Sequence, residues 1–164
     1  EKYAGEGFEV VLTSTLQRTR QTVRSFIESG IPWEQFPEID EMSWGVHEGQ
    51  KPDATMIAEY KTLMEHWKNE QYDAKLDGGE SARQLGQRID RFIEILKKRP
   101  ERKILVCTHG RAMRALICRM KNQPLKNMEH VGHKNTGLYI ARFDGNEFHF
   151  LTENERSHWT RPAT

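Results

Sequence analysis

The sequence predicts an α/β fold, a three-layer sandwich in which a mostly parallel sheet is flanked by helices. Residues 8–13 and 103–108 are rich in aliphatic and β-branched side chains, as strands buried on both faces are, and each run leads into a helical segment. Strands that alternate with helices favour a parallel sheet between helical layers. Two later strands, near 138–143 and 147–151, flank an Asp-Gly-Asn turn and predict a hairpin.

The composition is that of a single polar domain covering residues 1–164. Charged residues make up 30% of the chain, and 25 Lys and Arg balance 24 Asp and Glu to a formal net charge of +1. This balance gives no support for a nucleic-acid or membrane partner, and no apolar run approaches the roughly 20 residues of a membrane span. With two cysteines among apolar residues and no signal-peptide pattern, we expect a cytoplasmic protein whose oligomeric state stays open.

The first strand leads into a helix predicted from about residue 16 to 27. Ser14 is its natural N-cap, and Gly30-Ile31-Pro32 ends it. Residues 33–52 are expected to be mostly loop, because they hold two prolines and two glycines. A loop of this length in a compact domain is often functional.

Three further helices are predicted. Asp53 caps one that runs to about residue 70, and the next runs from about Ser81 to residue 98. The third follows His109-Gly110, at the end of the second buried strand. The apolar stripe of the second helix consists of Leu85, Ile89, Phe92, Ile93 and Leu96.

In parallel sheets, sites form beyond the carboxyl ends of the strands, which singles out residues 13–18 and 108–114. His109 lies between a buried strand and a helix start, where free backbone N–H groups favour an anion and an imidazolium would add positive charge. The alternative is a histidine that caps the helix or bonds to the backbone.

Two more segments supply candidates. Arg18 falls in the first turn of its helix, where the dipole disfavours a cation unless an anion compensates, and a guanidinium suits phosphate; the alternative is an ordinary surface arginine. In the long loop, carboxylates among Ile39, Met42 and Trp44 are candidates for a general acid with a raised pKa. The alternative there is an acidic loop in solvent.

Five motifs in register make the chain resemble the histidine phosphatase (phosphoglycerate-mutase-like) superfamily. In chain order they are Ser-x-Leu-x-Arg at 14–18, an acidic pattern at 39–49, Gly79-Glu80-Ser81, Thr108-His109-Gly110, and Asn135-Thr136. In the acidic pattern, Ile39 replaces the family's leucine. The resemblance covers nearly the whole chain.

The resemblance implies a phosphomonoester hydrolase that needs no metal or cofactor and acts on a small phosphorylated metabolite through a phosphohistidine intermediate. Arg18 would clamp the phosphoryl group and His109 would stabilise the intermediate. Glu41 would protonate the leaving alcohol, and Glu38 fits the pattern less well. The substrate-binding residues implied in the same way are Ser14, Glu80 and Gly110.

The family's nucleophile lies in an Arg-His-Gly motif at the end of the first strand, and this tripeptide is absent from the 164 residues. His47 and His133 are not credible replacements, since neither follows an arginine at a strand end. We therefore expect a first strand and phosphate loop upstream of Glu1. That strand would lie beside the one ending at His109, so the chain alone is expected to expose an apolar sheet edge and not to turn over.

Two other functions stay open. A phosphoglycerate mutase is one, although the short spacer between Glu41 and residue 79 favours a phosphatase. The other is a catalytically inactive relative that binds a phosphate ligand. The retention of Arg18, Glu41 and His109 counts against it. The substrate is not specified, and four aromatic residues either line a pocket or belong to the core: Trp44, Tyr60, Trp67 and Tyr72.

Overall fold

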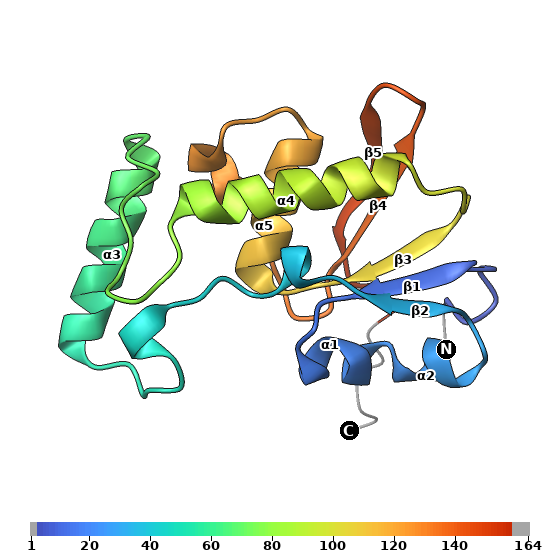
Figure 1. The fold of residues 1–164 in the computed structure, drawn as a ribbon, viewed down its shortest axis with the longest axis horizontal. Coiled ribbons are helices and arrows are strands. Elements are labelled where there is room, and N and C mark those ends of the chain that lie inside the picture. The colour runs from blue at the N-terminus through green and yellow to red at the C-terminus, as the bar shows by residue number, and fades with distance from the viewer. Residues whose placement is uncertain (1–2, 159–164) are drawn as a thin grey trace.

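The computed structural model describes residues 3–158 and confirms the predicted class, a parallel sheet with helices on both faces (Figure 1). The short helices α1 and α2 lie below the sheet in Figure 1, and α4 and α5 lie above it. The sheet has the order β2-β1-β3, and both pairings are parallel. Its strands are β1 (Val10–Thr13), β2 (Trp33–Gln35) and β3 (Ile104–Cys107).

The central strand β1 is the most buried element of the sheet. All of its residues are buried, and Val11 and Leu12 have no exposed surface. Val11 pairs with Trp33 on one side and Leu105 on the other. A strand covered by neighbours at both edges and by helices on both faces requires an apolar run of this kind.

The edge strand β3 is less buried than predicted, because all four of its residues are only half-buried. It pairs with β1 on one side, and no strand between residues 3 and 158 pairs with its other side.

Three local features differ from the sequence prediction. The helix expected from 16 to 27 is split into α1 (Gln17–Thr22) and α2 (Arg24–Glu28), with buried Val23 between them. The N-cap of α1 is Leu16 rather than Ser14, because the helix begins at Gln17; the Ser14 hydroxyl accepts from the Leu16 N–H at 3.1 Å. Strand β2 lies in the stretch expected to be loop.

The remaining elements follow the prediction closely. Asp53 caps α3 (Ala54–Lys68) by accepting from the Met56 N–H at 2.8 Å, and Ser81 forms a capping box with Gln84 at the start of α4 (Ala82–Lys97). The other elements are α5 (Gly110–Met120), the antiparallel hairpin of β4 (Leu138–Phe143) and β5 (Phe148–Glu155), and the 3₁₀ turns η1 (Pro37–Ile39), η2 (Gly45–His47) and η3 (Leu125–His130).

The core lies chiefly between the sheet, α4 and α5. Leu85, Ile89 and Phe92 of α4 have no exposed surface, as the apolar stripe predicts. Truncating a buried phenylalanine such as Phe92 to alanine typically costs about 3–5 kcal/mol. Within residues 3–158, no helix combines the length and the apolar character that crossing a bilayer requires.

Candidate active site

The candidate site lies where β1 and β3 end side by side. Thr13 pairs with Cys107 at the last position of the ladder, so the residues after each strand emerge at the same edge of the sheet. Ser14 follows β1 and His109 follows β3 by two residues, with α1 and α5 beginning beside them. The structure therefore brings together the two segments that the strand-end rule singles out.

Both ring nitrogens of His109 bond to the segment after β1. Arg18 Nε donates to Nδ1 at 2.9 Å, and Nε2 lies 2.7 Å from Ser14 Oγ. An arginine nitrogen can only donate, so Nδ1 accepts, and the ring hydrogen is assigned to Nε2, which donates to Ser14. Ser14 Oγ then donates to Thr19 Oγ1 at 2.9 Å, and Thr19 donates to the Leu16 carbonyl at 2.8 Å. These groups form one directed chain of hydrogen bonds.

The environment of His109 favours its neutral form. The side chain is nearly buried, at 8% exposure. Burial, followed by the positive charge of Arg18, lowers the pKa of His109, while Glu41 and Asp40 act in the opposite direction. Burial of the ring, together with the positive charge of Arg18 beside it, therefore disfavours an imidazolium at this position.

The guanidinium of Arg18 is bonded at Nε and, within the described residues, unbonded at its two terminal nitrogens. Arg18 is an exposed residue, and its Nε donates to His109. The two terminal guanidinium nitrogens form no hydrogen bond with any residue from 3 to 158. A planar pair of this kind matches two oxygens of a phosphate or carboxylate.

Glu41 is bound at the N-terminus of α5. Its Oε1 accepts from the backbone N–H groups of Met42 at 2.9 Å and of Arg111 and Ala112 at 3.2 Å, and its Oε2 accepts from Arg111 at 3.3 Å. A helix N-terminus favours negative charge, so this carboxylate occupies the place that an anionic ligand would otherwise take. The amides expected to meet a phosphoryl group are engaged by Glu41 in this state.

Arg88 of α4 fixes the loop that carries Glu41. Its Nε and Nη2 bind both carboxylate oxygens of Glu80 at 2.7 and 2.8 Å, and its Nη1 donates to the backbone carbonyls of Glu38 and Asp40. The Arg88 and Glu80 side chains are only 12% and 17% exposed. Glu80 therefore acts on the site through Arg88 and the loop, and its carboxylate does not line the pocket next to Glu41.

A pocket of about 290 Å³ adjoins Glu41 and Gly110. Trp44 and Tyr60 line it with their ring centroids 5.5 Å apart. Arg111 donates to Tyr60 Oη at 2.6 Å, and its guanidinium lies 5.9 Å from the Trp44 ring. The other lining residues are Arg114, Glu129 and His133.

Two of the four aromatic residues singled out in the sequence line this pocket. They are Trp44, which also packs against the core, and Tyr60, whereas Trp67 is 2% exposed and Tyr72 packs against the core. Arg111 and Arg114 both bond to the single carboxylate of Glu129, the latter at 2.9 Å. The pocket thus offers flat aromatic surface beside hydrogen-bonding charged groups.

His133 belongs to this site, although the sequence pattern argues against it. Its ring lies against the first residue of α5, because a Cβ added to Gly110 would come within 3.1 Å of both Cε1 and Nε2. No Arg-His-Gly signature marks it, and the contact joins residues distant in sequence. The nearest local signal is Asn135-Thr136, two residues downstream.

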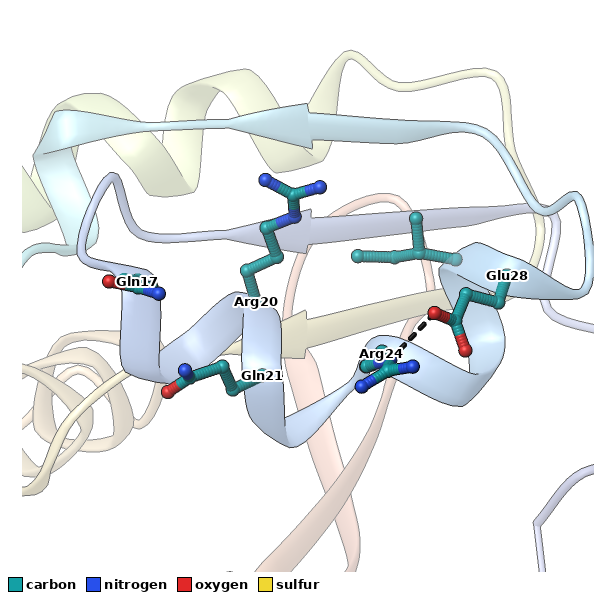
Figure 2. A pocket seen from close by; sticks show the side chains of 6 residues that line it. Gln17, Arg20, Gln21, Arg24 and Glu28 are labelled. Carbon is teal, nitrogen blue, oxygen red and sulfur yellow. Dashed lines mark hydrogen bonds and ion pairs between the residues drawn. The ribbon is translucent and has the colours of Figure 1, made fainter.

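A second hollow of about 220 Å³ runs along α1 and α2 (Figure 2). Arg24 and Glu28 form an ion pair of 2.6 Å there, and Arg20 lies with its guanidinium 5.0 Å from the Trp33 ring. The lining residues are Gln17, Arg20, Gln21, Arg24, Ile27 and Glu28. Arg18 is not among them, so two neighbouring arginines of α1 have separate surroundings.

Comparison with known proteins places this geometry in a family. Residues 1–156 match the model of the histidine phosphatase superfamily (branch 1). A probable phosphoglycerate mutase of Serratia proteamaculans is 31% identical over 144 residues, which cover 84% of this chain and 65% of that protein. A putative phosphoserine phosphatase of Hydrogenobacter thermophilus is 26% identical over 126 residues, covering 77% of this chain and 61% of that protein. The chain thus spans less than two thirds of the length of both relatives.

Solved structures agree on the fold. An alpha-ribazole phosphatase of Shigella flexneri superposes with a TM-score of 0.80 at 24% identity, covering 96% of this chain and 79% of that one. A mycobacterial glucosyl-3-phosphoglycerate phosphatase, solved with inorganic phosphate, gives a TM-score of 0.74 at 18% identity, covering 94% and 80%.

Proposed function

The chain belongs to the histidine phosphatase superfamily, and from this premise we propose that it hydrolyses phosphomonoesters of small metabolites. One observation carries the proposal: a fixed His109 ring lies beside the free guanidinium nitrogens of Arg18, at the edge where β1 and β3 end. Relatives named as phosphatases of phosphoserine and of fructose 2,6-bisphosphate support the same reaction class.

The proposed roles follow from the contacts. Arg18 binds two phosphoryl oxygens through its terminal nitrogens, while His109 and Ser14 hold that arginine and the ring in place. Gly110 brings the start of α5 close to the phosphoryl group. Glu41 hands a proton to the leaving alcohol, as the resemblance implies.

The proposed mechanism includes a phosphohistidine intermediate, as the resemblance to the family implies. The chain itself contains no Arg-His-Gly tripeptide, and the outer edge of β3 has no partner strand among residues 3–158. A strand added there would end beside His109, because parallel strands share the direction of their carboxyl ends. This arrangement would deliver a nucleophile opposite the leaving group.

A phosphoglycerate mutase is the second candidate, favoured by the relative of that name at 31% identity. Product analysis separates the two. A phosphatase releases free phosphate from a phosphate ester, whereas a mutase interconverts 2- and 3-phosphoglycerate with a bisphosphate primer and retains the phosphoryl group.

The test of the site is His109→Ala in the purified full-length protein. We expect phosphate release from p-nitrophenyl phosphate to fall about 10³-fold in kcat/KM, the scale found when a preorganised charge-stabilising group is lost. His66→Ala, an exposed histidine on α3, is the matched control and should retain activity. Unchanged hydrolysis by His109→Ala would show that the reaction centre lies elsewhere.

A further inference from the structure

We propose that Arg111 and Arg114 form a binding site for a carboxylate on the alcohol part of the substrate, and that Glu129 is an internal carboxylate which this group displaces. The inference rests on the proposed phosphatase function and names the class of ester that it would take, a phosphomonoester of a hydroxy acid. It depends on where the leaving alcohol lies, how the two arginines are held, and which carboxylate they bind in the structure.

Under the proposed function, the leaving alcohol lies in the pocket of about 290 Å³. Glu41, which is assigned to the protonation of this alcohol, lines that pocket together with Gly110. Its carboxylate lies against the start of α5, where it accepts from the Arg111 N–H at 3.2 Å. An alcohol that takes its proton from Glu41 therefore extends along the pocket wall that α5 provides.

Arg111 and Arg114 line this wall from one face of α5. They are three residues apart, the spacing that places side chains on the same side of a helix. The Arg111 side chain is only 7% exposed, and its guanidinium donates to Tyr60 Oη at 2.6 Å and lies 5.9 Å from the Trp44 ring. A guanidinium held in this way loses little conformational freedom when an anion binds.

The carboxylate of Glu129, in η3, bonds to both arginines. Its Oε1 accepts from Arg111, and its Oε2 accepts from Arg114 at 2.9 Å. The Glu129 side chain is 43% exposed, whereas the Arg111 side chain is buried, so the glutamate can turn into solvent and the arginine cannot. The site matches a carboxylate, because one already occupies it.

The two arginines have more donors and more charge than Glu129 uses. Nε of Arg111 and both Nε and Nη2 of Arg114 form no hydrogen bond with any residue from 3 to 158. Two positive side chains face one negative side chain, while the Glu41 carboxylate is bonded to backbone N–H groups. This excess of positive charge favours an added anion and disfavours a cationic group on the substrate.

The pKa of His133 reflects the same excess of positive charge. Partial burial, followed by the charge of Arg114, lowers the pKa of this ring, with Arg111 and Lys134 acting in the same direction and Glu41 in the other. The ring lines the pocket and is neutral above neutral pH. Selection by charge is therefore left to the two arginines.

The loop of His133 forms another wall of the pocket and is held from β5. The Asn154 side chain packs between Gly132 and Gly137, where a Cβ on Gly132 would approach its Nδ2 to 2.9 Å and one on Gly137 would clash with its Oδ1. Tyr139 Oη donates to the Gly132 carbonyl at 2.7 Å. This wall is thus fixed, which limits the alcohol part to a compact group.

The experiment compares two esters of nearly equal shape in the full-length protein at pH 7.5. They are 3-carboxyphenyl phosphate, which carries the carboxylate, and 3-carbamoylphenyl phosphate, in which a neutral amide replaces it. We expect kcat/KM to favour the carboxylate ester about 10-fold, the scale of a charge-assisted hydrogen bond. The preference should lie in KM, because the contact is remote from phosphorus and is made equally in the ground and transition states.

Two variants with opposite expected signs make the test specific to this site. Arg114→Met removes one arginine and should lower the preference to about 2-fold or less, through a higher KM for the carboxylate ester alone. Glu129→Gln keeps the size of the side chain but removes the competing charge, and should raise the preference about 3-fold. The matched control is Arg119→Met, further along α5, whose guanidinium pairs with Asp90 outside the pocket and which should leave the preference unchanged.

The outcomes separate the inference from the proposed function. Hydrolysis of p-nitrophenyl phosphate without a preference for the carboxylate ester overturns the carboxylate site while the phosphatase function stands. A preference that Glu129→Gln leaves unchanged or lowers does the same, and so does an equal loss of preference in Arg114→Met and Arg119→Met. Release of phosphate from none of the three esters by the wild-type protein overturns both.

Discussion

The two sides of the α5 N-terminus are built in opposite ways. On the side of β1, His109, Ser14, Thr19 and the Nε of Arg18 are joined in a directed chain of hydrogen bonds. On the side of the pocket, the ring nitrogens of His133 form no hydrogen bond with residues 3–158. The closed side depends on residues adjacent to two paired strands. The open side is assembled from the loop of Glu41 and Trp44, from α3, α5 and η3, and from the loop of His133.

This difference indicates that the His109 half of the site is already arranged before a ligand binds. Groups held by one another need no rearrangement to stabilise charge, which makes the His109 side suited to the phosphoryl group that every substrate would share. On the pocket side, the ring nitrogens of His133 form no hydrogen bond with residues 3–158 and are available to a ligand. Selection among substrates is therefore expected there.

Among variants that test the difference between the two sides, Arg18→Ala should cause the largest loss of activity. Removing the guanidinium takes away the proposed phosphate fork and leaves His109 Nδ1 without its donor. In the full-length protein we expect kcat/KM for p-nitrophenyl phosphate to fall about 10²- to 10³-fold, or about 3–4 kcal/mol.

The matched control is Arg20→Ala, two residues along the same helix. Its guanidinium lies over Trp33 in the second hollow, away from His109 contacts. A comparable loss in both variants would mean that α1 as a whole, rather than the fork of Arg18, supports activity.

The next largest effect is a loss of stability when the loop that carries Glu41 loses its contact with Arg88. Arg88→Met removes the partner of the buried Glu80 carboxylate and of two loop carbonyls, so we expect a loss of about 3 kcal/mol in the free energy of unfolding. Urea denaturation measures it. The exposed pair of Arg83 with Asp73 supplies the control, and Arg83→Met should leave the midpoint nearly unchanged. Equal stability of both variants would show that the loop does not depend on Arg88.

The smallest effect is a pH dependence of stability from the closed side. The pKa of His109 is lowered in the folded state, so the unfolded chain binds a proton more readily, and stability is lost as the pH falls below about 6.5 through the lowered pKa. Urea midpoints at pH 7.5 and 5.5 should show this decline, and His109→Gln should reduce its slope. An unchanged slope would assign the proton uptake to other groups.

The strands and helices that local pattern can specify were predicted well. The apolar runs of β1 and β3, the stripe of α4 and the caps Asp53 and Ser81 each contain their own signal. Strand β2 has only three residues, two of them exposed, and it is a strand because it pairs with β1. No sequence window contains that pairing.

The residues of the candidate site likewise fall into those that local sequence could predict and those that it could not. Ser14 and Arg18 could be placed beside His109 because strand ends fix them, and five motifs in register agreed. His133 could not, because its contact with Gly110 depends on a loop held by a distant strand. The break of the first helix at Val23 also carried no local sign, since neither glycine nor proline occurs there.

Asn154 gives the hairpin a part in the site that its position in the chain does not suggest. The hairpin shares no hydrogen-bonded ladder with the parallel sheet among the described residues, yet its second strand sets the separation of Gly132 and Gly137. A chain shortened to end before β5 would keep the whole parallel sheet, His109 and Arg18, but would lose the spacer that holds the His133 loop.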